Sequence, residues 1–166
     1  MGFFGPGLRF IETISSIHDK PELYPFPAEE AEHLEVEMVW NHYQHGAFQT
    51  ELGDWQASYD CFTSALRCRT EAAAKGYTGL PREFVIHGGI GNGCHGLGRH
   101  IEAERYYQKA LELQPENVPF DVYEVLICHS LMAQGQPRFA EANQRLELFI
   151  ERRKEMYGPD DTVDFM

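Results

Sequence analysis

Basic residues are scarce in this chain. It has 14 Lys and Arg against 26 Asp and Glu, which gives a formal net charge of −12. Between Lys20 and Arg67 there is no Lys or Arg, whereas nine acidic residues occur there. Because a nucleic-acid-binding protein needs a basic face to meet phosphates, the composition argues against that class of partner. The acidic stretch fits either a solvated helix face or a surface that attracts a basic partner.

Long apolar runs are also missing. No segment approaches the roughly 18 consecutive apolar residues that a membrane span needs, so we expect no membrane partner. The opening segment MGFFGPGLRF contains Pro6 and three glycines, and it lacks the long apolar stretch and small-residue cleavage site of a signal peptide. We therefore expect a cytoplasmic protein.

Several motifs of chemical sites are absent as well. His42 and His45 lie three residues apart, but there is no H-E-x-x-H and no third ligand that spacing would mark, so we expect no metal and no cofactor. No serine has the flanking glycines of a G-x-S-x-G elbow. The cysteines form no C-x-x-C pair, and their apolar helical surroundings predict reduced core thiols rather than two disulfides. They are Cys61, Cys68, Cys94 and Cys128.

Helical patterns are abundant from Pro27 onward. Residues 1–26 are irregular and rich in glycine and proline, and we interpret them as an N-terminal arm. Amphipathic segments bounded by Gly and Pro then fill a domain over residues 27–158, and residues 159–166 form a tail. No strand–helix alternation appears. The predicted helices are 27–53, 55–76, 82–97, 100–113, 118–135 and 137–158.

The chain contains an internal repeat. Ala110-Leu111 repeats Ala65-Leu66, and Leu97-Gly98 repeats Leu52-Gly53, both at an offset of 45 residues. The second copy has the tetratricopeptide spacing W-x-x-L-G-x-x-Y, A-x-x-x-F, P, carried by His87, Ile90, Gly91, Cys94, Ala103, Tyr107 and Pro115. The first copy keeps Gly46, Gly53, Ser58, Phe62 and Ala65 in the corresponding places. A weaker third copy, offset by about 37, runs through Val122, Cys128, Gly135 and Ala140, and its second helix has no Phe or Tyr at the aromatic position unless its frame slips by two residues.

On these residues the chain resembles the tetratricopeptide repeat family over residues 36–160. The stretch GLGRHIEAERYYQKALELQP is the most specific part, and ERRKEMYGPDDTV resembles the longer-helix variety found in kinesin light chains and fungal multi-repeat signalling proteins. The resemblance implies an all-α fold, a tetratricopeptide-type helical-hairpin solenoid of about three repeats. It also implies a scaffold or adaptor that binds other polypeptides and is not an enzyme.

The stretch HGGIGNGCHGLG offers a rival interpretation. It contains G-x-G-x-x-G at Gly91, Gly93 and Gly96, the pattern of a dinucleotide-binding turn. That turn needs a following strand with an acidic residue, and the region around 112–117 is a helix end and a proline loop instead. We therefore expect a helix here. The alternative left open is a small-molecule carrier or enzyme that uses residues 87–98 with His95, His129, Cys94 and Asp121.

The family resemblance also implies where a partner binds. The first helix of each pair lines a concave groove, and residues four and three positions apart along that helix face the groove. We predict a peptide-binding groove formed by Tyr43, Thr50, Asn92, His95, His129 and Met132, with Gly88 at an equivalent position. The basic carboxylate clamp of the family has no counterpart, so the groove should prefer apolar or basic peptides.

The last predicted helix has more apolar surface than one neighbour covers, which is contributed by Leu146, Leu148, Phe149 and Ile150. A solenoid needs a polar outer face on its terminal repeat. We therefore expect this helix to take part in self-association or to be covered by the arm or by a partner. A further possibility is that the chain is an oligomerisation fragment of a longer repeat protein.

Overall fold

The computed structural model describes residues 28–115 and 122–158, and these are helical almost throughout. The predicted arm and tail, and Asp121, lie outside the described residues. No strand occurs within the described ranges, and no helix there is long and apolar enough to cross a membrane. The elements are α2 (Ala28–Leu52), α3 (Trp55–Ala74), α4 (Glu83–Gly96), α5 (His100–Leu113), α6 (Val122–Ala133), the 3-10 helix η2 (Gln136–Arg138) and α7 (Phe139–Tyr157).

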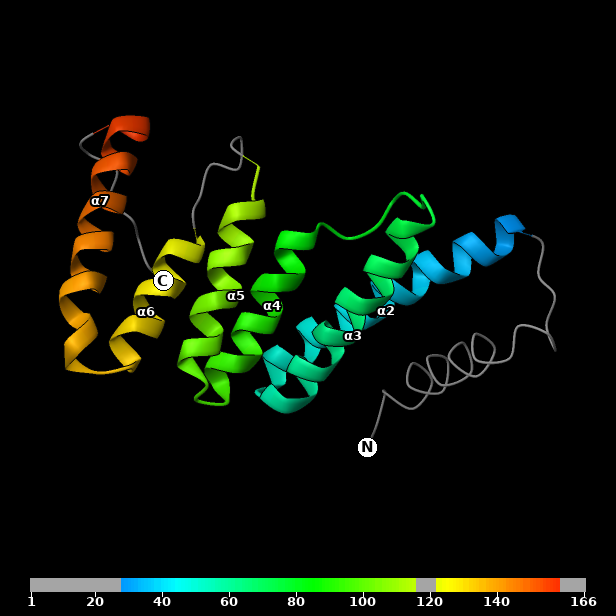
Figure 1. Cartoon of the computed structure of the whole chain (residues 1–166), viewed down its shortest axis with the longest axis horizontal. Helices are drawn as coiled ribbons and strands as arrows, with labels where there is room; N and C mark the ends of the chain where they lie inside the picture. The colour runs from blue at the N-terminus through cyan, green and yellow to red at the C-terminus, as the bar shows by residue number, and fades with distance from the viewer. Residues whose placement is uncertain (1–27, 116–121, 159–166) are drawn as a thin grey trace.

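The helices form three hairpins arranged in a row, α2–α3, α4–α5 and α6–α7 (Figure 1). Each hairpin packs on the next through the contacts of α3 with α4 and of α5 with α6, and α2 also touches α4. Buried residues of α3 to α7 belong to one continuous hydrophobic core. The prediction of an all-α solenoid of helical hairpins is confirmed.

The Leu-Gly pairs that are 45 residues apart form the same turn in two hairpins. Gly53 has φ +73° and Gly98 has φ +74°, a left-handed conformation that glycine adopts without a steric penalty. After the first turn, the side chain of Asp54 accepts a hydrogen bond from the backbone N–H of Ala57 at 3.1 Å and caps α3.

One packing contact also recurs at the 45-residue offset. The ring of Phe62 in α3 covers Gly46 of α2, and the ring of Tyr107 in α5 covers Gly91 of α4. A Cβ atom on Gly46 would lie 2.9 Å from the Phe62 ring, and one on Gly91 would lie 2.5 Å from the Tyr107 ring. Both rings are almost fully buried. The two hairpins are therefore copies in their internal contacts as well as in their sequence pattern.

The third hairpin follows the predicted register only in its first helix. Gly135 ends α6 with a positive φ, at the predicted offset of 37 from Gly98. In the second helix, however, Ala140 is exposed and Ala142 is buried, so the prediction that Ala140 matches Ala103 is wrong. Residues Gln136–Arg138 form η2 before α7 begins, and this extra turn moves α7 by two residues.

Candidate functional site

The glycine-rich stretch is the helix α4, and four of its five glycines are covered by aromatic rings. A Cβ atom at Gly88, Gly89 or Gly91 would lie 2.5 Å from the nearest ring atom, closer than real contacts allow. The covering rings come from three different helices, α3, α5 and α6. The pairs are Gly88 with Tyr123, Gly89 with Phe62, Gly91 with Tyr107 and Gly96 with Trp55, whereas Gly93 lies against the backbone and Cβ of Tyr59. These rings fill the space that a phosphate would need beside the glycines, so the dinucleotide-binding interpretation finds no support.

The enzymatic alternative also finds no support in the surroundings of Cys94. Cys94 is completely buried, and burial is the main cause that raises the pKa of its thiol to about 11. A thiol with such a pKa is protonated at neutral pH and is a poor nucleophile. All four cysteines are free, and Cys128 donates a hydrogen bond to the carbonyl of Ala142 at 3.5 Å. Within residues 28–115 and 122–158, no three His, Cys, Asp or Glu side chains cluster in a way that could hold a metal ion.

Two tyrosines of the first helices, Tyr43 and Tyr123, interact electrostatically. Tyr43 of α2 packs edge-on against the ring of Phe62, with centroids 5.7 Å apart. Tyr123 of α6 covers Gly88, and its hydroxyl donates to the carbonyl of Phe84 at 3.3 Å. Burial raises the pKa of Tyr123 to about 12, and Tyr43 adds to this increase. Gly88 is therefore buried beneath a ring rather than open to a groove.

The polar groups of Thr50 and Asn92 are engaged inside the hairpins. The Thr50 hydroxyl donates to the carbonyl of Gly46 at 3.0 Å and lies 2.7 Å from the Ser58 hydroxyl. The Asn92 side-chain oxygen accepts a hydrogen bond from the Tyr107 hydroxyl at 2.9 Å. Both side chains are half-buried. Each therefore has a structural role. On these two side chains, the amide nitrogen of Asn92 is the donor that remains for other contacts.

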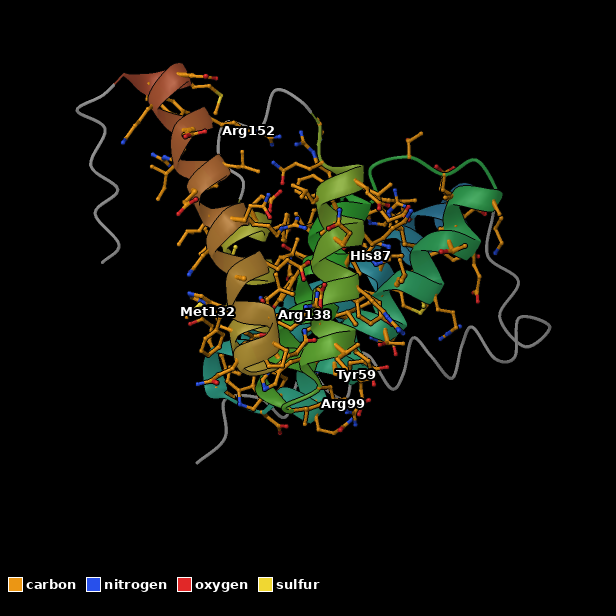
Figure 2. All side chains as sticks on the ribbon, turned by 60° about the vertical axis from the view of Figure 1, so that its left-hand side comes forward. Tyr59, His87, Arg99, Met132, Arg138 and Arg152 are labelled. Atoms are coloured by element: carbon orange, nitrogen blue, oxygen red, sulfur yellow. The ribbon has the colours of Figure 1, made fainter. Side chains whose placement is uncertain are left out.

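The structure brings His95 and His129 together at the end of α4 and α6. Nδ1 of His95 lies 3.4 Å from the Ser130 hydroxyl, and the ring centroids of His95 and His100 are 5.0 Å apart. Burial lowers the pKa of His95, and the nearby His100 and His129 lower it further. His129 is exposed, and Met132, one turn later, is 49% exposed (Figure 2).

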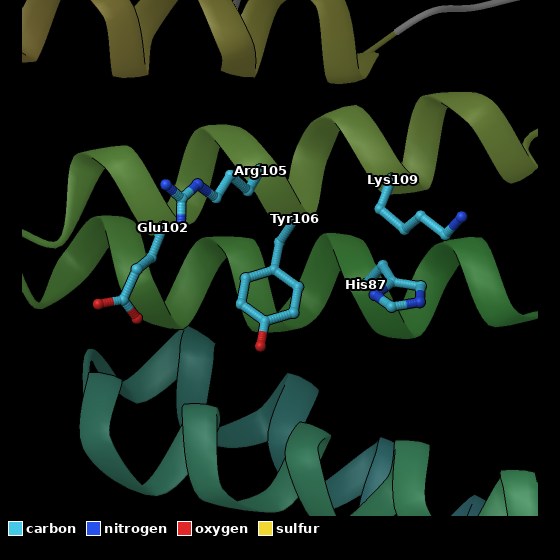
Figure 3. Close-up of a pocket in the computed structure, with 5 residues that line it drawn as sticks. All are labelled: His87, Glu102, Arg105, Tyr106 and Lys109. Atoms are coloured by element: carbon cyan, nitrogen blue, oxygen red, sulfur yellow. The ribbon is translucent and has the colours of Figure 1, made fainter.

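A separate cavity of about 390 Å³ lies between α4 and the outer side of α5 (Figure 3). Its floor is the ring of His87 stacked on Tyr106, with centroids 6.0 Å apart. Burial lowers the pKa of His87, against the opposing effect of Glu83. Glu102, Arg105 and Lys109 complete the lining, and the two cations can attract a carboxylate. None of the predicted groove residues lines this cavity, because the prediction considered only first helices.

Neither the role of Tyr123 nor the cavity was predicted from the sequence. A signal for Tyr123 was present, since Gly88 stands at the position that Tyr43 holds one repeat earlier, and a missing side chain there leaves room for a neighbouring ring. The cavity has no such signal, because the spacing of Glu102, Arg105 and Lys109 is that of any solvated helix face.

Comparison with known proteins agrees with the geometry of the second hairpin. A family model described as tetratricopeptide repeat matches residues 85–117, which include most of α4 and all of α5. No curated protein matches the chain, and no solved structure matches it either. A tetratricopeptide repeat is in general a protein–protein interaction module. The chain is thus an all-α solenoid of helical hairpins whose second hairpin is similar to a tetratricopeptide repeat.

Proposed function

We propose that this protein is an adaptor that binds a peptide or helix of another polypeptide along its first helices. The binding surface, the first-helix face, consists of Tyr43 and Thr50 of α2, Asn92 and His95 of α4, and His129 and Met132 of α6. The observation that carries the proposal is the corner formed by His95, His129 and Met132. There, the half-buried His95 of α4 interacts electrostatically with His129 of α6, and the exposed His129 and Met132 lie one turn apart on α6.

The chemistry of this corner favours an apolar or basic peptide. The exposed Met132 side chain is apolar and adaptable, which suits a hydrophobic anchor residue of a partner. The amide nitrogen of Asn92 can donate to a peptide carbonyl while its oxygen stays bonded to Tyr107. The net charge of −12 attracts a basic ligand over long distances.

We also propose that the protein is cytoplasmic, that it has no chemistry of its own and that it self-associates through α7. We also propose the longer-helix variety of the repeat, because α3 and α7 have 20 and 19 residues whereas α5 has 14.

The experiment begins with selection of peptides from a random display library on the full chain. The affinity of a selected peptide is then measured by fluorescence anisotropy. The double substitution His129→Ala and Met132→Ala should weaken binding about tenfold or more, a loss of about 1.4 kcal/mol. The control, Arg105→Ala with Lys109→Ala, changes only the separate cavity and should leave affinity unchanged. The opposite pattern would reject the first-helix face and place the ligand in the cavity.

The role of Asn92 needs its own pair of variants. If the Asn92 amide donates to the peptide, Asn92→Ala should weaken binding several-fold, whereas Tyr107→Phe should bind normally although it loses the same internal hydrogen bond. Thermal unfolding of both variants controls for stability. Equal loss of affinity in the two variants would show that Asn92 acts only through the fold.

A further inference from the structure

The cavity beside α5 is separate from the first-helix face, and the proposed function does not use it. Its volume of about 390 Å³ lies within the range of roughly 300–1,000 Å³ that is usual for ligand pockets. Four of its five lining residues come from α5, at spacings of three and four that place them on one side of that helix. They are Glu102, Arg105, Tyr106 and Lys109, and α4 contributes His87. A ligand in this cavity would therefore lie along α5.

Two stacked rings form the floor of the cavity. The rings of His87 and Tyr106 are 28° from parallel, with centroids 6.0 Å apart. His87 is 8% exposed, and its Nε2 atom lies 3.6 Å from the carboxylate of Glu83, which Arg69 of α3 holds at 2.6 Å. Contacts between α3 and α4 thus fix the position of the floor. A fixed floor suits an apolar side chain of a ligand, because little rotamer freedom is lost when that side chain covers it.

A cationic side chain lies at each end of this floor. In Figure 3, Arg105 and Lys109 extend in opposite directions along α5, with the ring of Tyr106 between them. Both are exposed, and within residues 28–115 and 122–158 Arg105 takes part in no ion pair. Lys109 pairs with Glu112 at 3.4 Å, and both of these side chains are about half exposed. Such an exposed pair contributes little, so Lys109 can turn to a ligand at low cost.

The charges of the lining favour an anionic ligand. The two cations outnumber the one acidic residue, Glu102, which lies at the Arg105 end of the cavity in Figure 3. Burial lowers the pKa of His87, so its ring is neutral at neutral pH. Arg145 shows what such a side chain does elsewhere in the protein, since its guanidinium holds the carboxylate of Glu124 at 2.9 Å. Arg105 has the same group without a carboxylate, which a partner can supply.

We infer that this cavity is a second docking site, which binds an extended acidic peptide with an apolar residue between two carboxylates. The carboxylates bind Arg105 and Lys109, and the apolar side chain covers the rings of Tyr106 and His87. In an extended chain, alternate side chains point to the same face and lie about 7 Å apart, which matches a floor with a cation at each end. The first-helix face should prefer apolar or basic peptides, so the two sites bind partners of opposite charge. The docking site goes beyond the proposed function and does not depend on it.

The test is an NMR titration of the full chain with the peptide EAFAE, acetylated and amidated, and with its neutral counterpart QAFAQ. It is done at about 0.15 M salt, where charges more than roughly 8 Å away are screened and the local cations dominate. EAFAE should shift amide signals of α4 and α5 and bind at least tenfold more tightly than QAFAQ. Arg105→Gln with Lys109→Gln should lower the affinity for EAFAE at least tenfold. The control, Arg152→Gln with Lys154→Gln at exposed positions of α7, has the same net charge and should bind like the wild type.

Two further variants complete the test. Glu102→Gln removes the acidic group beside Arg105, so it should tighten binding of EAFAE several-fold and leave QAFAQ unchanged. His129→Ala with Met132→Ala changes only the first-helix face and should leave the affinity for EAFAE unchanged. A loss in that variant would place EAFAE at the first-helix face and overturn the docking site. Equal affinities for EAFAE and QAFAQ, no binding of EAFAE, or an equal loss in the α7 control would also overturn it, and none of these results bears on the first-helix face.

Discussion

At the scale of single residues, four glycines of α4 are positions where a neighbouring ring takes the place of a side chain. In an isolated helix each glycine costs about 1 kcal/mol relative to alanine. In this protein the cost is offset by burial of rings such as Phe62 and Tyr107, which are 4% and 1% exposed. A change that would favour an isolated helix should therefore harm this one.

We expect Gly89→Ala to lower the free energy of unfolding by about 1–2 kcal/mol, because overpacking outweighs the gain in helix propensity. Its Cβ atom would lie 2.5 Å from the ring of Phe62, which is buried and cannot move away. Gly46→Ala is the control, since its Cβ atom would lie 2.9 Å from the same Phe62 ring and should therefore cost less. Urea unfolding of both variants tests this. An equal effect at both positions would contradict the explanation by ring packing.

The same residues show what the sequence could predict and what it could not. The offset of 45 residues correctly identified the Gly46 and Gly91 positions, because the repeat spacing reports contacts within one hairpin. The contact of Tyr123 with Gly88 links two hairpins, and its geometry depends on how one hairpin is rotated on the next. Spacing along the chain contains no information on that rotation. The six predicted groove residues remain predictions until a ligand is bound.

At the scale of the helices, α7 is held by few buried residues, Ala142 and Phe149 among them. Arg145 adds a polar contact across three helices. Its guanidinium donates to Glu124 of α6 at 2.9 and 3.1 Å and to Gln108 of α5 at 3.4 Å. Both side chains of the ion pair are largely shielded from solvent, so this pair should stabilise α7 more than an exposed pair would.

We expect Arg145→Met to lower the free energy of unfolding by about 1 kcal/mol, because the methionine keeps an apolar stem but leaves Glu124 without its partner. Limited proteolysis should cleave within α7 several-fold faster. The control is Arg152→Met on the same helix, where the side chain is exposed. Both are measured at concentrations where the chain is monomeric. If the control were cleaved as fast as Arg145→Met, the contact with Glu124 would not be what holds α7.

In the third repeat, the sequence pattern places the second helix two residues too early. The end of α6 at Gly135 follows the predicted offset because a glycine with φ +102° ends the helix. The turn Gln136–Arg138 then adds two residues before α7. Pro137 is compatible both with a helix start and with a 3-10 turn, so the sequence pattern alone could not place the first residue of α7.

At the scale of the whole molecule, three histidines link stability to pH. The pKa values of His42, His87 and His95 are all lowered, and burial is the largest cause in each case. The folded protein therefore holds these rings neutral where the unfolded chain, with ordinary histidine pKa values near 6.5, takes up protons. Their contribution to stability is fully present above that value and is lost as the pH falls below it.

We expect the free energy of unfolding to fall between about pH 7.5 and about pH 5.5, the range that spans the ordinary histidine pKa. Urea unfolding of the wild type and of His95→Gln at both pH values measures this. The variant should lose less stability over the interval, since glutamine does not titrate. His33→Gln, at an exposed position, should lose as much as the wild type. A variant His95→Gln with an unchanged pH dependence would exclude His95 as a source of the effect.

The contacts between α3 and the glycines of α4 decide whether one hairpin can be exchanged for another. Trp55, Tyr59 and Phe62 of α3 lie against Gly96, Gly93 and Gly89 of α4, so this joint accepts one particular neighbour. The hairpins are thus not interchangeable parts. In a chain lengthened by copying α4 and α5, the new α4 would face α5, which has His100 and Glu104 at the positions of Trp55 and Tyr59. The contact surfaces between the hairpins therefore fix the order in which the units follow one another.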